Sequence, residues 1–231
     1  MTSTLERVLE PEVMDTADEA RDYDAMDHVL VNERFCADLR AHGALGATVL
    51  DVGTGTARIP IELCKDDASL RVVAIDLAEH MLALAEENVA RAGLVGRVSL
   101  AKVDAKSMPY DAGAFATTVS NSIVHHIPDP RTVLAEMARV TAPGGLVFVR
   151  DLARPANEAE VDRLVALYAG RPPADPAARA SFERQRDLFR ASLLAALTVE
   201  EVAAMANEAG LAGCAVAPTS DRHWTLSFRK P

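Results

Sequence analysis

Residues 48–63, TVLDVGTGTARIPIEL, decide the fold of this chain. An apolar run ends in Asp51, two glycines follow at Gly53 and Gly55, and apolar residues then recur at helical spacing. This order predicts a buried strand, a tight glycine turn and the start of a helix. Glycine tolerates positive φ and lets a ligand approach the backbone, and a helix start presents unpaired N–H groups. The stretch therefore predicts a ligand site at the end of a strand.

Two classes of ligand are bound by turns of this kind. Dinucleotide-binding folds have Gly-x-Gly-x-x-Gly, in which the third glycine allows close packing of helix and strand. Arg58 occupies that third position, which disfavours an NAD(P)-dependent oxidoreductase on a similar sheet. The residues present at alternate positions are Asp51, Gly53, Gly55 and Ala57. This alternation resembles motif I of the class I S-adenosylmethionine-dependent methyltransferases, in which the glycine loop lies under the amino-acid part of the cofactor.

Composition limits the class of protein. The chain has 231 residues and 49% hydrophobic content, enough for the core of one domain. Its net charge of −10, without a basic cluster, disfavours binding to nucleic acid or to an anionic membrane surface. The three cysteines are widely spaced, which favours buried thiols over disulfides. No leader-like segment and no apolar run of about 18 residues is found, so a cytoplasmic protein is expected.

Hydrophobic periodicity predicts strands and helices in alternation. The expected strands are 47–51, 71–75, 97–103, 114–120 and 146–151, followed by two late strands at 214–217 and 223–228. Alternation of this kind predicts parallel strands joined by right-handed crossovers. Together with the resemblance, it predicts an α/β fold with a doubly wound, mostly parallel, seven-stranded Rossmann-like methyltransferase sheet and a helical cap.

We expect a single domain over residues 1–231. Its expected parts are N-terminal helices at 1–43, a cofactor-binding core at 44–151, a helical insertion at 152–197, and a C-terminal helix with two strands at 198–231. A helical stripe is expected from Asp24 to His42, with Met26 near its start. The insertion is expected to form a lid over the carboxyl ends of the strands, where open α/β sheets bind ligands. Thr198 and Glu201 form a candidate capping box for the last helix.

Polar residues follow the expected strands at the points where the strands end. Asp76 ends the second strand, 25 residues after Asp51, where an acidic residue can accept hydrogen bonds from a ribose. The resemblance implies that Asp76 holds both ribose hydroxyls and that Asp104 and Ala105 contact the adenine. It also implies that Asn121 lies beside the reacting methyl group. The full expected set for S-adenosylmethionine is Tyr23, Asp51, Gly53, Thr54, Gly55, Asp76, Leu77, Met81, Asp104, Ala105 and Asn121.

The segment SNSIVHHIPDP after the fourth strand contains candidate catalytic residues. Many small-molecule methyltransferases of this family have a histidine near this point. His125 and His126 differ in direction by about 100° on a helix, so at most one should point into a given site. An imidazole with a pKa near 6.5 can take a proton from an acceptor at neutral pH. A packing role in the core is the alternative for either ring.

Asp151 follows the fifth strand, where acceptor contacts usually fall in the family, and it is the third candidate catalytic residue. An exposed charge at the start of the insertion is the alternative. A metal site would show ligands at helical i, i+4 spacing or a larger ligand set, and neither is visible, so no metal is expected. Trp224, near the end of the chain, is expected in the core.

The predicted activity is methyl transfer from S-adenosylmethionine to a small-molecule acceptor. The main contribution of the protein would be to hold donor and acceptor in line, which saves roughly 7–11 kcal/mol of barrier. Three alternatives stay open at this stage: an oxidoreductase, a methyltransferase acting on protein or RNA, and a relative that keeps the cofactor for regulation or for another reaction.

Overall fold

The computed structural model describes residues 5–11, 15–25 and 29–231, apart from the side chains of residues 176 and 177. Met26, expected in a helical stripe, lies outside the described residues. One seven-stranded sheet has the order β3-β2-β1-β4-β5-β7-β6. Its strands are β1 (Thr48–Val52), β2 (Arg71–Asp76), β3 (Val98–Lys102), β4 (Phe115–Asn121), β5 (Thr141–Leu152), β6 (Ala215–Pro218) and β7 (His223–Arg229). Strands β1 to β5 pair in parallel and β7 is antiparallel to both of its neighbours, which confirms the expected fold class.

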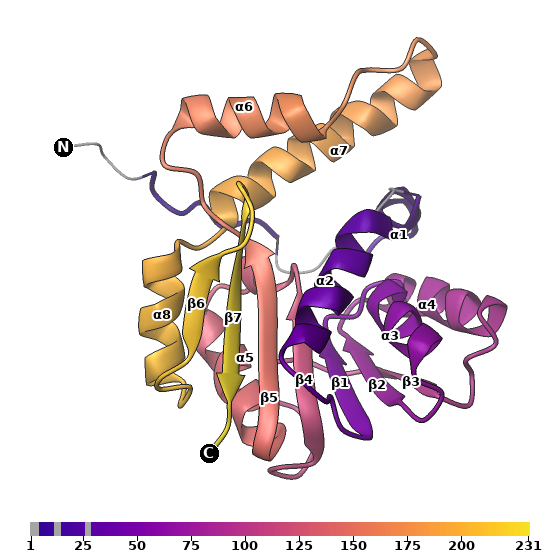
Figure 1. The fold of residues 1–231 in the computed structure, drawn as a ribbon. Coiled ribbons are helices and arrows are strands. Elements are labelled where there is room, and N and C mark those ends of the chain that lie inside the picture. Colours follow the sequence, from indigo (N-terminus) through magenta and orange to yellow (C-terminus); the bar gives the residue numbers. More distant parts are fainter. Residues whose placement is uncertain (1–4, 12–14, 26–28) are drawn as a thin grey trace.

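Helices cover both faces of the sheet (Figure 1). They are α1 (Ala17–Asp24), α2 (Val29–Ala41), α3 (Arg58–Asp66), α4 (Glu79–Arg91), α5 (Pro130–Val140), α6 (Glu158–Tyr168), α7 (Pro176–Ala195) and α8 (Val199–Glu208), with a short 3-10 turn η1 (Val124–His126). Apolar side chains of α2, α3 and α4 pack on one face of the sheet, and those of α5 and α8 pack on the other. Trp224 of β7 is fully buried, which confirms its expected place in the core.

The N-terminal helices differ from the expected stripe over residues 24–42. The first helix, α1, ends at Asp24, and α2 is described over Val29–Ala41. A capping box fixes the start of α1, because the Thr16 hydroxyl accepts from Glu19 N (3.2 Å) and the Glu19 carboxylate accepts from Thr16 N (3.1 Å). This local signal was missed because the segment has few apolar residues.

The fifth strand is longer than expected, since β5 begins at Thr141 and not at residue 146. The register against β4 jumps from Phe115–Thr141 to Thr117–Leu146. The Pro-Gly-Gly sequence at residues 143–145 therefore forms an irregularity inside β5.

Helices α6 and α7 lie beyond the end of the sheet at which β5 ends (Figure 1). They pack against each other through a small apolar cluster that includes Leu152, Leu164 and Leu193. Residues 5–11 run along this layer, and Val8 N donates to Leu194 O (3.1 Å). The expected capping box of α8 is confirmed by hydrogen bonds in both directions between residues 198 and 201.

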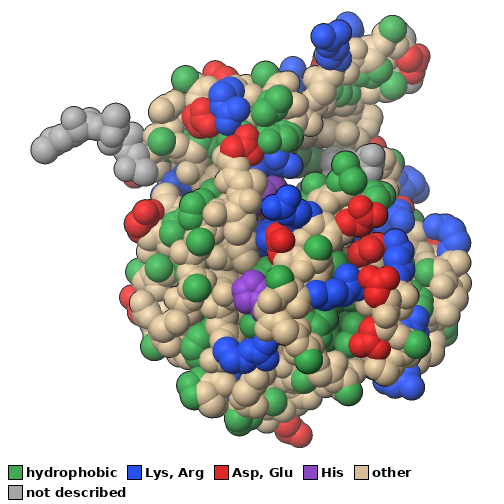
Figure 2. All heavy atoms as spheres, viewed as in Figure 1, with side chains coloured by type: hydrophobic (Ala, Val, Ile, Leu, Met, Phe, Trp, Pro, Cys, Tyr) green, Lys and Arg blue, Asp and Glu red, His purple; other side chains and the backbone are tan. Residues whose placement is uncertain are grey.

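The surface carries charges of both signs. Acidic and basic side chains lie interspersed on the face seen in Figure 2. None of the described helices combines the length and the apolar character that crossing a membrane would require.

Candidate functional site

The ends of four neighbouring strands line one cavity, which we call the strand-end cavity. It encloses about 800 Å³, including the space at its open mouth. Its lining residues follow β1, β2, β3 and β4, with one contribution from α1: Tyr23, Gly53, Gly55, Asp76, Leu77, Ala78, Met81, Val103, Asp104, Ala105, Lys106, Asn121, Ser122, Ile123, His126 and Ile127. Nine of the eleven residues expected to bind the cofactor are in this set. The other two, Asp51 and Thr54, line a smaller cavity that shares Tyr23, Gly53 and Asn121 with the first.

The glycine turn after β1 brings backbone to the cavity wall. Gly53 has φ +74° and Gly55 has φ +54°, both in the left-handed region that favours glycine. The N–H groups of Gly53 and Thr54 both donate to Ile75 O (2.9 Å each), which ties the turn to β2. A Cβ on Gly53 would lie 2.2 Å from Cγ2 of Ile123, so only glycine fits there.

The third small residue of the motif is Ala57, at a position where the family usually has a third glycine. Ala57 has φ 61° and is fully buried, so it adopts a backbone conformation that favours glycine. It precedes α3 and makes no side-chain capping hydrogen bond. The helix start therefore depends on the turn and not on a capping side chain.

The carboxylate of Asp76 joins the turn to the second strand. Oδ2 accepts from Gly55 N (2.7 Å) and Oδ1 accepts from Ala78 N (2.9 Å). Burial raises the pKa of Asp76 although these backbone donors oppose the shift. Both carboxylate oxygens thus have fixed directions at the cavity wall.

A second acid, Asp51, is buried below the turn. It is 1% exposed, and within the described part of the chain its Oδ2 atom has no hydrogen-bond partner. Burial raises the pKa of Asp51 to about 7, and the nearby Asp76 carboxylate adds to this shift. Thr54 Oγ1 is another buried atom that finds no partner among the described residues. These atoms are free to bind a hydrogen-bond donor or a cation.

Two further expected residues of the cavity wall, Asp104 and Tyr23, come from the segment after β3 and from α1. Asp104 accepts from Lys106 N (2.9 Å) and from Lys106 Nζ (3.0 Å), and although burial acts in the other direction, these contacts lower the pKa of Asp104. Tyr23 of α1 also lines the cavity, and burial raises its pKa to about 12. Asp24 fixes α1 through contacts with Arg58 (2.8 Å) and Asn88 (3.0 Å).

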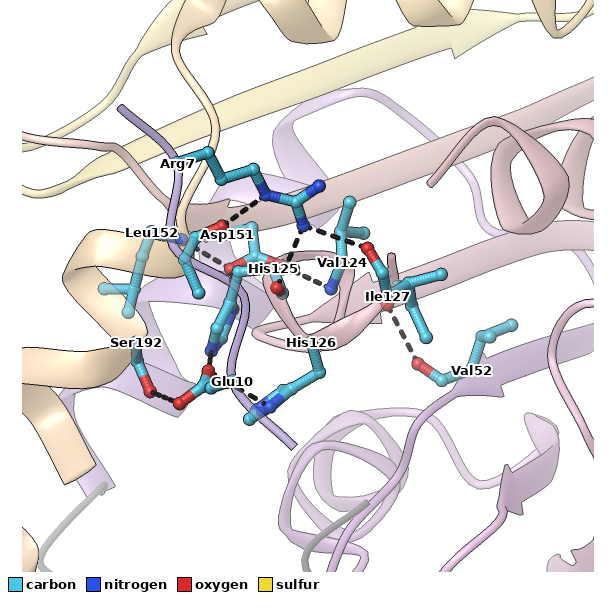
Figure 3. A network of polar contacts seen from close by, with 12 residues as sticks. Arg7, Glu10, Val52, Val124, His125, His126, Ile127, Asp151, Leu152 and Ser192 are labelled. Carbon is cyan, nitrogen blue, oxygen red and sulfur yellow. Dashed lines mark hydrogen bonds and ion pairs between the residues drawn. The ribbon is translucent and has the colours of Figure 1, made fainter. Parts of the chain in front are cut away.

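The three candidate catalytic residues lie close together, but only His126 lines the cavity. Figure 3 shows the group to which they belong, and we call it the buried polar network: Arg7, Glu10, His125, His126 and Asp151. Asp151 is fully buried, so the alternative of an exposed charge is wrong. Its carboxylate accepts from His125 Nδ1 (2.5 Å) and from the backbone N–H groups of residues 124, 125 and 152.

Burial and neighbouring charge act differently on the members of this network. Burial alone would lower the pKa of His125, but the Asp151 carboxylate outweighs it and raises that pKa. In turn, although burial opposes the change, the His125 ring lowers the pKa of Asp151. Burial and the neighbouring His125 lower the pKa of His126 to about 3, and burial raises the pKa of Glu10. His126 is therefore neutral at physiological pH.

The expectation that adjacent histidines diverge needs a correction. Only His126 lines the strand-end cavity, as the angular argument predicts, yet both rings face the same carboxylate. Glu10 Oε1 lies 3.5 Å from His125 Nε2 and 3.2 Å from His126 Nδ1, and the two ring centroids are 4.1 Å apart. The argument failed because the turn fixes only the direction of each Cα–Cβ bond. Side-chain rotation lets both rings of η1 reach Glu10, which comes from a separate segment of the chain.

Several residues of these sites were missed by the sequence analysis. Arg7 and Glu10 lie in a segment without periodicity, more than 110 residues before the histidines that they contact, so no local signal marks them. Ser122 and Ile123 directly follow Asn121 in the cavity wall. Their position after a strand was a usable signal.

Known proteins match the chain chiefly over its core. Residues 49–145 match the family described as "Methyltransferase domain". A phosphatidylethanolamine N-methyltransferase of Cereibacter sphaeroides is 35% identical over 127 residues, which cover 54% of this chain and 61% of that protein. A ubiquinone/menaquinone biosynthesis C-methyltransferase of Geobacter sulfurreducens is 29% identical over 113 residues, 48% of this chain and 44% of that protein. The chain thus spans less than two thirds of these curated relatives.

Solved structures match over nearly the full length. A SAM-dependent methyltransferase from Aquifex aeolicus superposes with a TM-score of 0.65 at 20% identity, covering 92% of this chain and 97% of that one. A putative S-adenosyl-L-methionine-dependent methyltransferase from Methanococcus maripaludis gives a TM-score of 0.69 at 18% identity, covering 96% and 97%. At these identities the likeness establishes the fold.

Proposed function

We propose that this chain transfers a methyl group from S-adenosylmethionine to a small-molecule acceptor, because its residues 49–145 match the methyltransferase domain family. The observation that carries the proposal is the shared lining of one cavity by Gly53, Gly55, Asp76 and Asp104. These residues come from three different strand ends, and they are the ones for which the family resemblance implies contacts with the cofactor.

The residues around the cavity fit this cofactor. Asp51 Oδ2, buried and without a hydrogen-bond partner among the described residues, suits the ammonium group of an amino acid. The oxygens of Asp76 keep lone pairs that suit ribose hydroxyls, since each carboxylate oxygen has about two lone-pair sites and the backbone N–H groups of Gly55 and Ala78 take one on each. Gly53 and Gly55 bring the backbone of the turn to the cavity wall, where a ligand can approach it closely. The bound cofactor supplies a methyl group activated by a sulfonium sulfur.

The chain contributes mainly by positioning and by excluding water. Tyr23 and Ile123 contribute large side chains to the cavity wall, and hydrogen bonds to backbone N–H groups orient Asp76 and Asp104 there. Orientation of this kind is worth roughly 7–11 kcal/mol of barrier. His126 and Ile127 are the lining residues that we assign to the acceptor, because they lie on the segment after β4 and not on the donor turns.

The class of acceptor is supported by the names of the relatives and by the surface. Those names describe transfer to a phospholipid and in quinone biosynthesis, both small molecules compared with protein or RNA. The net charge of −10 also disfavours an RNA acceptor. We further propose that α6 and α7 act as a lid, supported by contacts of Ser181 (2.9 Å) and Arg184 (3.1 Å) with Asp22 of α1. A cytoplasmic location stays a prediction from the sequence.

Calorimetry with S-adenosylhomocysteine tests the donor assignment. Asp76→Ala should weaken binding by at least about 100-fold, because it removes hydrogen bonds to a charged group worth about 1.5–3 kcal/mol each. Glu79→Gln is the matched control, since Glu79 lies three residues away, is exposed and does not line the cavity. Circular dichroism of both variants should match that of the wild type. Unchanged affinity in Asp76→Ala would remove Asp76 from the site.

A second measurement separates the proposal from its alternatives. Incubation with S-adenosylmethionine and a panel of phenols, quinols and amines should produce S-adenosylhomocysteine with at least one acceptor. Tight binding of NAD or NADP, without binding of S-adenosylhomocysteine, would favour the oxidoreductase. Donor binding without any product across the panel would favour a regulatory relative.

A further inference from the structure

The buried polar network contains a cluster of metal-binding groups beside the strand-end cavity. Glu10 Oε1, His125 Nε2 and His126 Nδ1 lie within 4.8 Å of one another (Figure 3). The side chains are 5%, 4% and 15% exposed, respectively. They come from two segments, residues 5–11 and η1, which are far apart in sequence. The fold therefore brings two imidazoles and one carboxylate together at a site largely closed to bulk water.

Two of the three facing atoms lack a hydrogen-bond partner. Among the residues that the structure describes, neither Glu10 Oε1 nor His126 Nδ1 makes a hydrogen bond, although both are buried. Leaving such atoms unpaired is costly, and native structures contain few of them. The two atoms face each other at 3.2 Å. An ion between them would satisfy both.

The far sides of the ligands are held by hydrogen bonds. Asp151 Oδ1 accepts from His125 Nδ1 (2.5 Å), which leaves Nε2 directed at Glu10. Ser192 Oγ of α7 donates to Glu10 Oε2 (3.2 Å), which leaves Oε1 directed at the histidines. Ligating histidines in metalloproteins almost always donate their second nitrogen to such a carboxylate or carbonyl. The surroundings therefore fix the orientation of both His125 and Glu10.

We propose that Glu10, His125 and His126 form a binding site for one divalent transition-metal ion such as Zn²⁺. Two histidines and one carboxylate are a common ligand set for zinc and for non-haem iron. With bonds of about 2.1 Å, neighbouring ligands lie about 3.0 Å apart around an octahedral ion and about 3.4 Å apart around a tetrahedral one. The observed separations of 3.2 and 3.5 Å match these spacings. His126 also lines the cavity, so the ion adjoins it.

An ordinary surface pair in the same chain provides the contrast. His80 and Asp15 also join a ring nitrogen to a carboxylate, at 3.0 Å. His80 is half exposed, and its ring and backbone both bond Asp15, so neither group is left without a partner. That pair has no third ligand among the described residues. His80→Gln is therefore the matched control for weak binding of metal to surface histidines.

Titration of chelator-treated, desalted protein with Zn²⁺ tests stoichiometry and residues. The wild type should bind one equivalent, and Glu10→Gln and His126→Asn should each weaken binding by at least about 10-fold. His80→Gln should bind as the wild type does. Equal losses in the control and the cluster variants, or no saturable binding by the wild type, would overturn the proposal.

Co²⁺ absorption of the wild type tests the ligand chemistry without any variant. We expect d–d bands between about 500 and 650 nm, typical of nitrogen and oxygen ligands, or weak bands of a six-coordinate ion. Strong thiolate charge transfer in the near ultraviolet would assign the ion to one of the three cysteines and would overturn the proposal. Neither measurement involves methyl donor or acceptor, so the result is independent of the proposed function.

Discussion

The strand-end cavity and the buried polar network lie next to each other but are built in different ways. The cavity is made by short turns that follow neighbouring strands of the sheet. Its backbone hydrogen bonds join the turn after β1, at residues 53–55, to Ile75 and Asp76 of β2. The network is made by side chains from the N-terminal segment, the turn after β4 and the end of β5. The cavity therefore depends on backbone conformation, whereas the network depends on long-range side-chain contacts.

Arg7 shows how much the network depends on a single side chain. Its guanidinium donates to four backbone carbonyls: His125 (3.1 Å), Ile127 (2.9 Å), Pro128 (3.2 Å) and Ala195 (2.7 Å). One side chain thus joins the turn after β4 to the end of α7. The difference teaches that changes in the network should act on stability and leave ligand binding nearly unchanged, whereas changes in the turns alter the cavity wall itself.

The largest effect is expected at Gly53, in the glycine turn of the cavity. Gly53→Ala should cost about 4 kcal/mol of unfolding free energy, because the new Cβ meets Ile123 in a left-handed backbone conformation. Gly55→Ala is the control: its Cβ would lie 3.5 Å from Tyr23, so only the backbone cost of about 1 kcal/mol remains. Urea unfolding measures both. Equal losses would show that the contact with Ile123 contributes nothing.

Arg7→Ala should destabilise the protein by about 3 kcal/mol, since it leaves partly buried carbonyls without their charged donor. Arg163→Ala, which removes only exposed ion pairs, should cost less than about 1 kcal/mol. Binding of S-adenosylhomocysteine to Arg7→Ala, measured where the variant is folded, should change less than about fivefold. A larger loss of affinity would contradict the separation of the two regions.

The buried acid of the cavity should make stability depend on pH. The folded-state pKa of Asp51, about 7, lies above that of an ordinary aspartate, so folding takes up a proton between these values. Stability therefore falls as pH rises through this window. Relative to Asp51→Asn, the wild type should lose about 2 kcal/mol between pH 5 and pH 7. Exposed Asp111→Asn should follow the wild type, and a pH profile of Asp51→Asn that parallels the wild type would refute the assignment.

The smallest effect is expected at Ala57. Ala57→Gly removes a left-handed strain of about 1 kcal/mol but also one buried methyl group worth about 0.8 kcal/mol. Stability should therefore change by less than about 0.5 kcal/mol, and donor affinity should stay the same. A change above about 1.5 kcal/mol in denaturant unfolding would mean that the methyl group has a further packing role.

Much of the fold and of the cavity could be predicted because the signals are local. The expected strands 47–51 and 71–75 agree with β1 and β2 within one residue, since buried parallel strands are short apolar runs that end in turns. Asp76, Asp104 and Asn121 could be grouped because parallel strands end at the same edge. The resemblance of the core to methyltransferases agrees with the family match over residues 49–145. The binding roles of individual residues stay predictions.

The rest could not be predicted because the contacts are long-range or irregular. Glu10 meets the histidines across 115 residues, and nothing near Glu10 marks this partner. The start of α1 at a capping box lies in a weakly periodic segment, so apolar spacing does not reveal it. The irregularity inside β5 depends on pairing with β4, which only the assembled sheet defines.

The contacts of Arg7 have a consequence for engineering. Because residues 5–11 bind both the turn after β4 and the end of α7, these three segments form one exchangeable unit. A chimaera that takes α6 and α7 from a relative in order to change acceptor preference should therefore also take the N-terminal segment. Grafting the helices alone would set Arg7 of the host against a foreign α7 end in place of its partner Ala195.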